Sequence, residues 1–202
     1  VLVFSWGSPT SGIPLAWAAS AQRPGVSLLP DFSDSAARDI ANQVRSVKQP
    51  GDVVVLSVHW GGNWGYGISS EERRFARRLL AKTGVDVVHG HSSHHPKAIE
   101  VYRGKLILYG CGDFINDYEG IDGYEAFRGD LGLMYFAEVD AGSGRLASLR
   151  MRATQLRRFQ VARASPEDAT WLAEVLSREG KAFHTTVRLA EGGELALDWG
   201  RA

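Results

Sequence analysis

Residues 52–59 of the chain read DVVVLSVH, and residues 84–91 read GVDVVHGH. Each stretch contains a short continuous apolar run, which is the pattern of a strand covered on both faces. Between them, residues 69–72 read SSEE, which predicts a capping box at the head of a helix that ends at Gly84. A strand, a helix and a second strand in this order predict a right-handed crossover between parallel neighbours. We therefore expect the two strands to end at Val58 and Val88, at the same edge of one sheet.

Further regular elements are expected on both sides of this unit. The sequence pattern predicts a strand at residues 1–6, a helix at 33–48, a hairpin at 98–109, a second hairpin at 131–151, a helix from Pro166 to Gly180 and a last hairpin turning at Gly192-Gly193. We therefore expect an α/β fold that forms one domain over residues 1–202. Because the chain opens on the strand-like residues VLVFSW without Met, we expect it to be the C-terminal part of a longer protein.

Composition limits the classes of partner. Lys plus Arg number 23 and Asp plus Glu number 23, so no overall field attracts nucleic acid, and a charged ligand needs a local site. The chain contains one cysteine, Cys111, which excludes an internal disulfide and a cysteine-based zinc cage. A bound metal would therefore have nitrogen and oxygen ligands. No apolar run approaches the roughly 18 residues that a membrane-spanning helix needs.

Histidines are concentrated in one part of the sequence. Five of the six lie between residues 59 and 95, where an even distribution would place about one. Neutral imidazole is a strong ligand for zinc, manganese and iron, and the two parallel strands would bring their ends together. We therefore predict that His59, His91 and His94 bind a divalent metal. The alternative, a histidine with satisfied hydrogen bonds and no ligand role, is accepted for His184, which lies alone in an expected strand.

Other polar residues near these histidines are also candidates for the site. His89 and His95 are candidates for a substrate contact, for a proton donor, or for a hydrogen bond that orients a metal ligand. Asp113 and Asp117 are candidates to accept a hydrogen bond from a ligand histidine or to hold a general acid. The alternative for the aspartates is a loop in which they bond their own backbone. Cys111 is interpreted as a buried structural thiol.

Aromatic residues separated by glycines follow His59. Trp60, Trp64 and Tyr66, with Asn63 among them, are candidates for substrate binding, because aromatic faces beside a polar site stack on a sugar or cover a polymer chain. The alternative, in which these rings pack beneath the loop, stays equally open.

Three segments of the chain resemble the bacterial capsule-synthesis CapA family, which is associated with poly-γ-glutamate biosynthesis. They are residues 51–61, residues 84–96 and residues 107–114. The resemblance implies a four-layer metallophosphoesterase-like β-sandwich flanked by helices, of which this chain would be a part. It also implies that His59 is a strand-end ligand and that His91 and His94 are the ligands of a Gly-His-x-x-His motif. For catalysis at such a site, His89, His95 and Asp113 are the candidates. Two metals would bind the attacking and leaving oxygens of a phosphoester.

The chain also departs from the pattern of such enzymes. The family's enzymes take an Asp-x-His pair, a bridging Asp and an Asn-His ligand from their N-terminal half, whereas no histidine follows Asn42, Asn63 or Asn116 here. We therefore expect the dinuclear site to be completed by an N-terminal segment of the same protein, with an anionic polymer or a phosphoester as substrate. The alternative function is a non-catalytic component that holds a polymer or a partner protein on the same fold.

Overall fold

The computed structural model describes residues 1–116 and 121–200. Within these residues the chain forms three α-helices, α1 (Asp34–Val47), α2 (Ser70–Lys82) and α3 (Pro166–Gly180). The first sheet has the order β1 (Leu2–Gly7), β2 (Val54–His59), β3 (Val87–His91), β5 (Lys105–Leu108) and β4 (Ile99–Tyr102). The second has the order β6 (Leu131–Val139), β7 (Leu146–Arg157), β10 (Glu194–Trp199) and β9 (Thr185–Leu189), and β8 (Gln160–Arg163) pairs with β7.

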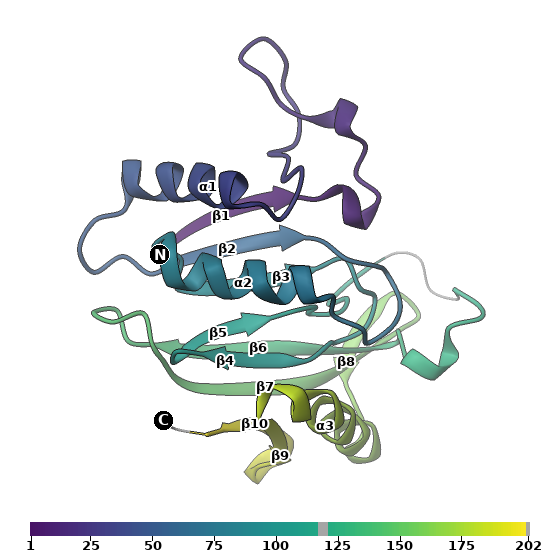
Figure 1. Cartoon of the computed structure of the whole chain (residues 1–202). Helices are drawn as coiled ribbons and strands as arrows, with labels where there is room; N and C mark the ends of the chain where they lie inside the picture. Colours follow the sequence, from purple (N-terminus) through teal and green to yellow (C-terminus); the bar gives the residue numbers. More distant parts are fainter. Residues whose placement is uncertain (117–120, 201–202) are drawn as a thin grey trace.

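The predicted crossover is present. β2 pairs with β3 in parallel, and α2 connects them (Figure 1). The capping box forms as expected: the Ser69 hydroxyl accepts from the Glu72 amide, and the Glu72 carboxylate accepts from the Ser69 amide. One boundary differs, because β3 continues through His91, whereas the sequence predicted a strand that ends at Val88. Two of the candidate histidines of this segment therefore lie in the sheet itself.

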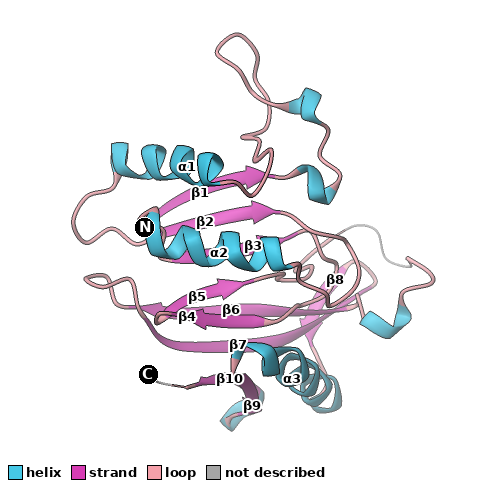
Figure 2. Ribbon diagram, in the orientation of Figure 1, coloured by secondary structure: helices cyan, strands magenta, loops and turns pink. Residues whose placement is uncertain are grey.

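One face of the first sheet is covered by α1 and α2 (Figure 2). Alternate residues of β2, Val54, Leu56 and Val58, point to this side and are completely buried with Phe75 of α2. Burial of each such side chain is worth about 1.5–3 kcal/mol relative to exposure. The alternation fixes which face the remaining β2 residues use, so Ser57 and His59 point to the opposite side.

The other face of the first sheet packs on the second sheet. Val87, Leu106 and Leu108 form one core cluster with Leu149 and Met151 of β7. This arrangement of two packed sheets with helices against them confirms the predicted α/β class, with α3 packed against β9, β4 and β7. The packed area does not extend to β1, since the side chain of Val3 on that strand is 65% exposed.

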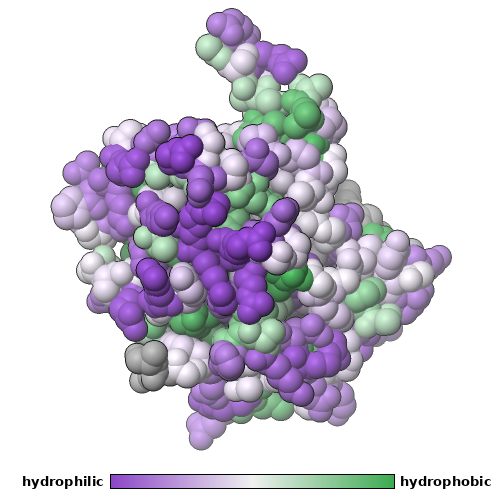
Figure 3. Space-filling view, viewed as in Figure 1, coloured by the Kyte–Doolittle hydropathy of each residue, from purple (hydrophilic) through white to green (hydrophobic). Residues whose placement is uncertain are grey.

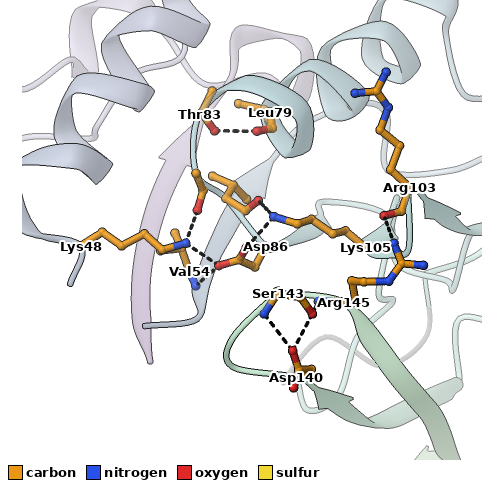
Figure 4. A network of polar contacts seen from close by, with 12 residues as sticks. Lys48, Val54, Leu79, Thr83, Asp86, Arg103, Lys105, Asp140, Ser143 and Arg145 are labelled. Carbon is orange, nitrogen blue, oxygen red and sulfur yellow. Dashed lines mark hydrogen bonds and ion pairs between the residues drawn. The ribbon is translucent and has the colours of Figure 1, made fainter. Parts of the chain in front are cut away.

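A charged network fixes the sheet at the end away from the histidines. The carboxylate of Asp86 accepts hydrogen bonds from Lys48 Nζ at 2.8 Å, from Lys105 Nζ at 2.6 Å and from the Val54 amide at 3.0 Å (Figure 4). Burial alone would raise the pKa of Asp86, but these hydrogen bonds outweigh it, and the pKa lies below the ordinary value. The network joins the C-terminal end of α1 to β2 and β5.

Some local expectations were wrong. His184, expected within a strand, stands before β9 with a left-handed φ of 57°. Strand β7 continues six residues beyond Met151, and β8 was not anticipated. Among the described residues, no helix combines the length and the apolar character that a membrane crossing requires.

Candidate metal centre and adjacent cavity

The parallel pairing of β2 with β3 sets His59 directly opposite His91. Their Nδ1 atoms are 3.1 Å apart, and the ring centroids are 5.0 Å apart. Both rings lie on the face of the sheet that points away from α1 and α2, because they share the alternation of Ser57. The backbone register, and not a flexible loop, therefore brings these two imidazoles together.

The spacing of the two nitrogens fits a shared metal ion. Two nitrogens bound to one zinc at about 2.0–2.1 Å in tetrahedral geometry lie about 3.4 Å apart, which is close to the observed separation. Without a metal, one Nδ1 would donate a hydrogen bond to the other. Burial, followed by the charges of His59 and His89, lowers the pKa of His91 to about 4, and burial, followed by the charge of His94, lowers the pKa of His59. At neutral pH both rings are uncharged, as metal ligands must be.

His94 is oriented by a carboxylate. Its Nδ1 lies 2.9 Å from Oδ2 of Asp113, and the Asn116 side-chain amide donates to the same oxygen at 2.7 Å. The His94 amide donates to the main-chain carbonyl of Asn63 at 3.0 Å, which fixes the loop backbone. An imidazole that bonds a carboxylate through one nitrogen presents the other nitrogen to a metal, as in many histidine–metal sites. This contact agrees with the role predicted for Asp113; Asp117 lies outside the described residues.

The three predicted ligands do not form one closed cluster. Within residues 1–116 and 121–200, no three His, Cys, Asp or Glu side chains are grouped closely enough to enclose an ion. The structure instead shows the His59–His91 pair, and His94 is near enough for its charge to influence the pKa of His59. Convergence of all three imidazoles on one ion therefore stays a prediction.

The backbone between His91 and His94 is strained. Ser92 has a φ of 126°, which residues with a side chain rarely adopt, and its hydroxyl donates to the Gly61 carbonyl at 3.1 Å. Such strain is often found at functional sites. Gly90, directly before His91, is required for packing. A Cβ on Gly90 would stand 2.5 Å from Trp60 Nε1, so this glycine serves packing on the helix side.

His89 and His95 differ in environment. His89 shares the face of His91, with ring centroids 5.6 Å apart, and its Nδ1 lies 3.2 Å from the Ser57 hydroxyl. His95 is completely buried, its Nδ1 bonds the Pro96 carbonyl at 3.1 Å, and its Nε2 accepts from the Gly65 amide at 3.1 Å. With both nitrogens occupied by main-chain groups, His95 holds the loop and is not placed to transfer a proton. The catalytic role predicted for His95 is therefore not retained.

Of the aromatic residues that are separated by glycines, some pack in the interior and one lines a cavity. Trp60 is only 3% exposed, and its indole donates to the Tyr109 carbonyl at 3.0 Å, so the packing alternative describes it. Tyr66 packs edge-on against His95, with centroids 4.7 Å apart. Trp64 faces a cavity and stacks on Tyr124, with centroids 4.4 Å apart and ring planes 6° apart. Of the three predicted aromatic contacts, Trp64 alone lines this cavity.

The cavity next to His94 has a volume of about 440 Å³. Trp64 and Tyr124 form an aromatic wall, and His94 and Asp113 lie in the same lining. This volume is in the range of small-molecule sites in proteins. The remaining lining residues are Asn116, Ile121, Glu125, Arg128, Gly129, Asp130, Leu156 and Arg157.

One segment that lines this cavity was not predicted from the sequence. Arg128 has a left-handed φ of 50°, and its guanidinium donates to both oxygens of Asp130, at 2.9 and 3.0 Å, and to Asp168 of α3 at 2.9 Å. These bonds hold the short 3-10 turn that carries Phe127, whose ring stacks on His95 with centroids 4.8 Å apart. The aromatic spacing of Tyr124 and Phe127 was the available signal.

Comparison with known proteins identifies the family that the chain resembles. Residues 1–118 match the family described as bacterial capsule synthesis protein PGA_cap. A Mycobacterium tuberculosis protein named "Probable polyglutamine synthesis accessory protein" is 48% identical over 184 residues, which are 91% of this chain and 48% of that protein. The Bacillus subtilis "PGA biosynthesis protein CapA" is 34% identical over 74 residues, 37% of this chain and 19% of that protein. The Bacillus anthracis "Capsule biosynthesis protein CapA" is 28% identical over 104 residues, 49% of this chain and 23% of that protein.

The mycobacterial match extends over nearly the whole chain, which spans about half the length of that relative. The family match extends over more than half of the chain, including β1, β2, β3 and the five histidines between residues 59 and 95. The predicted resemblance to capsule-synthesis proteins is confirmed. This chain belongs to the bacterial capsule synthesis PGA_cap family.

Proposed function

We propose that this chain supplies part of a metal-dependent, phosphoesterase-like site in a protein that assists the synthesis of a glutamate capsule polymer. The observation that carries the proposal is the His59–His91 pair, uncharged at neutral pH and spaced as two ligands of one ion. Family membership and the names of the relatives supply the biosynthetic setting. Because the chain spans about half of its mycobacterial relative, the activity belongs to the longer protein.

Three imidazoles would hold the metal. His59 and His91 would bind through the Nδ1 atoms that face one another, and His94 would bind through Nε2, because Asp113 occupies its Nδ1. A divalent ion at this position would lower the pKa of a bound water and polarise a phosphoester oxygen. The mixed nitrogen and oxygen donors of this region suit manganese, zinc or iron. A second ion of a dinuclear centre would need ligands from outside this chain.

The surrounding residues have defined tasks in this proposal. Asp113 fixes the orientation of His94 and, when His94 binds metal, keeps its proton on Nδ1. His89 lies on the same face as the metal ligands, next to the Ser57 hydroxyl, and is the candidate to exchange a proton with the reacting group. Trp64 and Tyr124 offer an aromatic wall to the organic part of a phosphoester or to a polymer end.

The test uses the full-length protein purified without chelator. We expect metal analysis to find manganese, zinc or iron, and we expect hydrolysis of bis(p-nitrophenyl) phosphate. Replacement His91→Ala should lower turnover at least about 100-fold while circular dichroism stays unchanged. The matched control is His184→Asn, which removes an exposed imidazole at a left-handed position that asparagine tolerates. A metal-free preparation with unaltered function would favour the non-catalytic alternative, and undiminished turnover of His91→Ala would exclude His91 as a ligand.

A further inference from the structure

The outer face of α2 concentrates positive charge in a chain whose net charge is zero. Arg74, Arg77, Arg78 and Lys82 follow one another along this helix, and Arg103 joins them from the turn between β4 and β5. These five residues, which we call the α2 face, line a hollow of about 360 Å³ together with Ala81 and Tyr102. In Figure 3, strongly hydrophilic residues gather over the part of the surface where Figure 1 places α2.

The cations of the α2 face are only partly neutralised. Arg77 pairs with the buried carboxylate of Glu100 at 2.7 Å, and Arg78 pairs with the exposed carboxylate of Asp34 at 2.8 Å. In the described part of the chain, no ion pair includes Arg74, Lys82 or Arg103. The nearby acidic residues Asp31 and Glu71 lie with Asp34 around a separate hollow, which Arg74 and Arg78 also line. Of the five cations of the α2 face, two are thus paired with carboxylates.

An aromatic ring gives this surface a fixed geometry. The guanidinium of Arg77 lies 5.1 Å from the centre of the Tyr102 ring, and that of Arg103 lies 5.5 Å from it. Arg77 is also held by Glu100, whose second oxygen accepts from the Tyr109 hydroxyl at 2.6 Å. Side chains on an ordinary solvated helix face are not held in this way. The arginines of the α2 face therefore lose less conformational freedom when a ligand binds. Guanidinium groups at fixed positions favour bidentate contacts with carboxylates.

We propose that the α2 face binds an extended polycarboxylate chain, the glutamate polymer of the proposed biosynthetic role. The identity of this polymer rests on the proposed function, whereas the cationic surface does not. From Arg74 to Lys82 the helix rises about 12 Å, enough to contact several successive carboxylates. Helix α2 begins at Ser70, directly after the loop that carries Trp64 and Tyr66. A polymer bound along the α2 face would therefore lead toward the cavity beside His94.

The test measures polymer binding by the full-length protein. Fluorescein-labelled poly-L-glutamate serves as the probe in anisotropy titrations, and an uncharged hydroxyethyl-glutamine polymer of the same length serves as the reference. The double variant Arg74→Glu with Lys82→Glu should bind poly-L-glutamate at least about tenfold more weakly. The control double variant, Arg38→Glu with Arg45→Glu, makes the same charge change at exposed positions of α1 and should stay within about twofold of wild type.

Salt and competing anions decide between possible ligands. Binding should weaken between about 20 mM and about 200 mM salt, because the contacts are partly exposed. Equal weakening by both double variants, or equal binding of the uncharged polymer, would overturn the proposal. Tighter binding of phosphatidylglycerol vesicles or of duplex RNA, lost in the α2 variant, would also overturn it and assign the face to that partner.

Polymer binding by the α2 face and metal binding by the histidines can be tested independently. The Arg74→Glu, Lys82→Glu variant should keep the metal content and the phosphodiester turnover of the wild-type protein. The His91→Ala variant should keep poly-L-glutamate binding. A wild-type protein that holds metal but does not bind poly-L-glutamate would overturn only the α2-face proposal, and one that binds poly-L-glutamate but holds no metal would overturn only the metal-site proposal.

Discussion

Nδ1 of His59 lies 3.1 Å from Nδ1 of His91 across the parallel pairing of β2 with β3. The two residues are 32 positions apart in the sequence, and the main-chain hydrogen bonds of the sheet fix their relative position. Strand-borne ligands are more rigidly placed than ligands on loops, which favours a preorganised metal site. His94 differs, because it lies beyond the end of β3 and depends on Asp113 and on the loop backbone for its orientation.

Replacement Asp113→Asn should weaken metal binding without unfolding the protein. Asparagine keeps the size of the side chain but loses the charge that orients His94 and raises its basicity, so we expect metal affinity to fall about 10- to 100-fold. Calorimetric titration of the full-length protein with Zn²⁺ or Mn²⁺ measures the change. Asp140→Asn, at an exposed hairpin turn, is the control. Equal affinity in Asp113→Asn and wild type would remove Asp113 from the site.

Replacement Trp60→Ala should mainly reduce stability. The buried indole packs with Phe32 and Tyr109 and donates a hydrogen bond to a main-chain carbonyl, so its loss leaves a cavity and an unpaired acceptor. We expect the free energy of unfolding to fall by about 3–5 kcal/mol, measured by urea denaturation. A loss below about 1 kcal/mol would contradict the assignment of Trp60 to the core.

Replacement Trp64→Ala should mainly reduce substrate binding. Trp64 forms one wall of the cavity beside His94, and an aromatic contact is worth about 0.5–1.5 kcal/mol beyond its buried area. We expect KM for bis(p-nitrophenyl) phosphate to rise up to about tenfold with kcat nearly unchanged. Trp64→Phe should recover most of the loss. An unchanged KM would show that the aromatic wall does not contact this substrate.

Replacement Asp86→Asn should change both stability and its pH dependence. The pKa of Asp86 in the folded protein lies below 3.8, so its charged form stabilises the fold above about pH 4, and this stabilisation is lost as the pH falls through the folded-state pKa. Removing the charge leaves Lys48 and Lys105 without their partner and should cost about 3 kcal/mol at neutral pH.

Urea denaturation at several pH values measures this effect. The variant should lose less stability than wild type on acidification, because one native carboxylate no longer has to be protonated. Asp140→Asn again serves as the control and should cause a smaller loss at neutral pH. Parallel pH profiles for wild type and Asp86→Asn would contradict the role assigned to the network.

The strands and the helix that carry the site could be predicted from the sequence, whereas the orientation of several side chains around it could not. Apolar runs and the Ser69–Glu72 capping box report local structure, so the crossover that pairs His59 with His91 could be predicted. Which way a side chain points depends on tertiary packing. His95 and Trp60 looked like site residues but have main-chain hydrogen bonds in the interior.

The cavity wall illustrates the same limit. Tyr124 is 60 positions from Trp64 in the sequence, and the two rings meet where Arg128 fixes the segment that follows Tyr124 to Asp130 and Asp168. No local periodicity reports a long-range contact of this kind. The fold class and the histidine pair were therefore accessible from the sequence, whereas the cavity required coordinates.

X-ray absorption at the K-edge of the bound metal tests the central claim most directly. The full-length protein and its His91→Ala variant are loaded with the same divalent ion, and the imidazole nitrogens at about 2.0–2.1 Å are counted in each. The account predicts imidazole scattering in the wild-type spectrum and one imidazole fewer in the variant. Identical first-shell spectra for the two proteins, or a wild-type spectrum without imidazole, would contradict it.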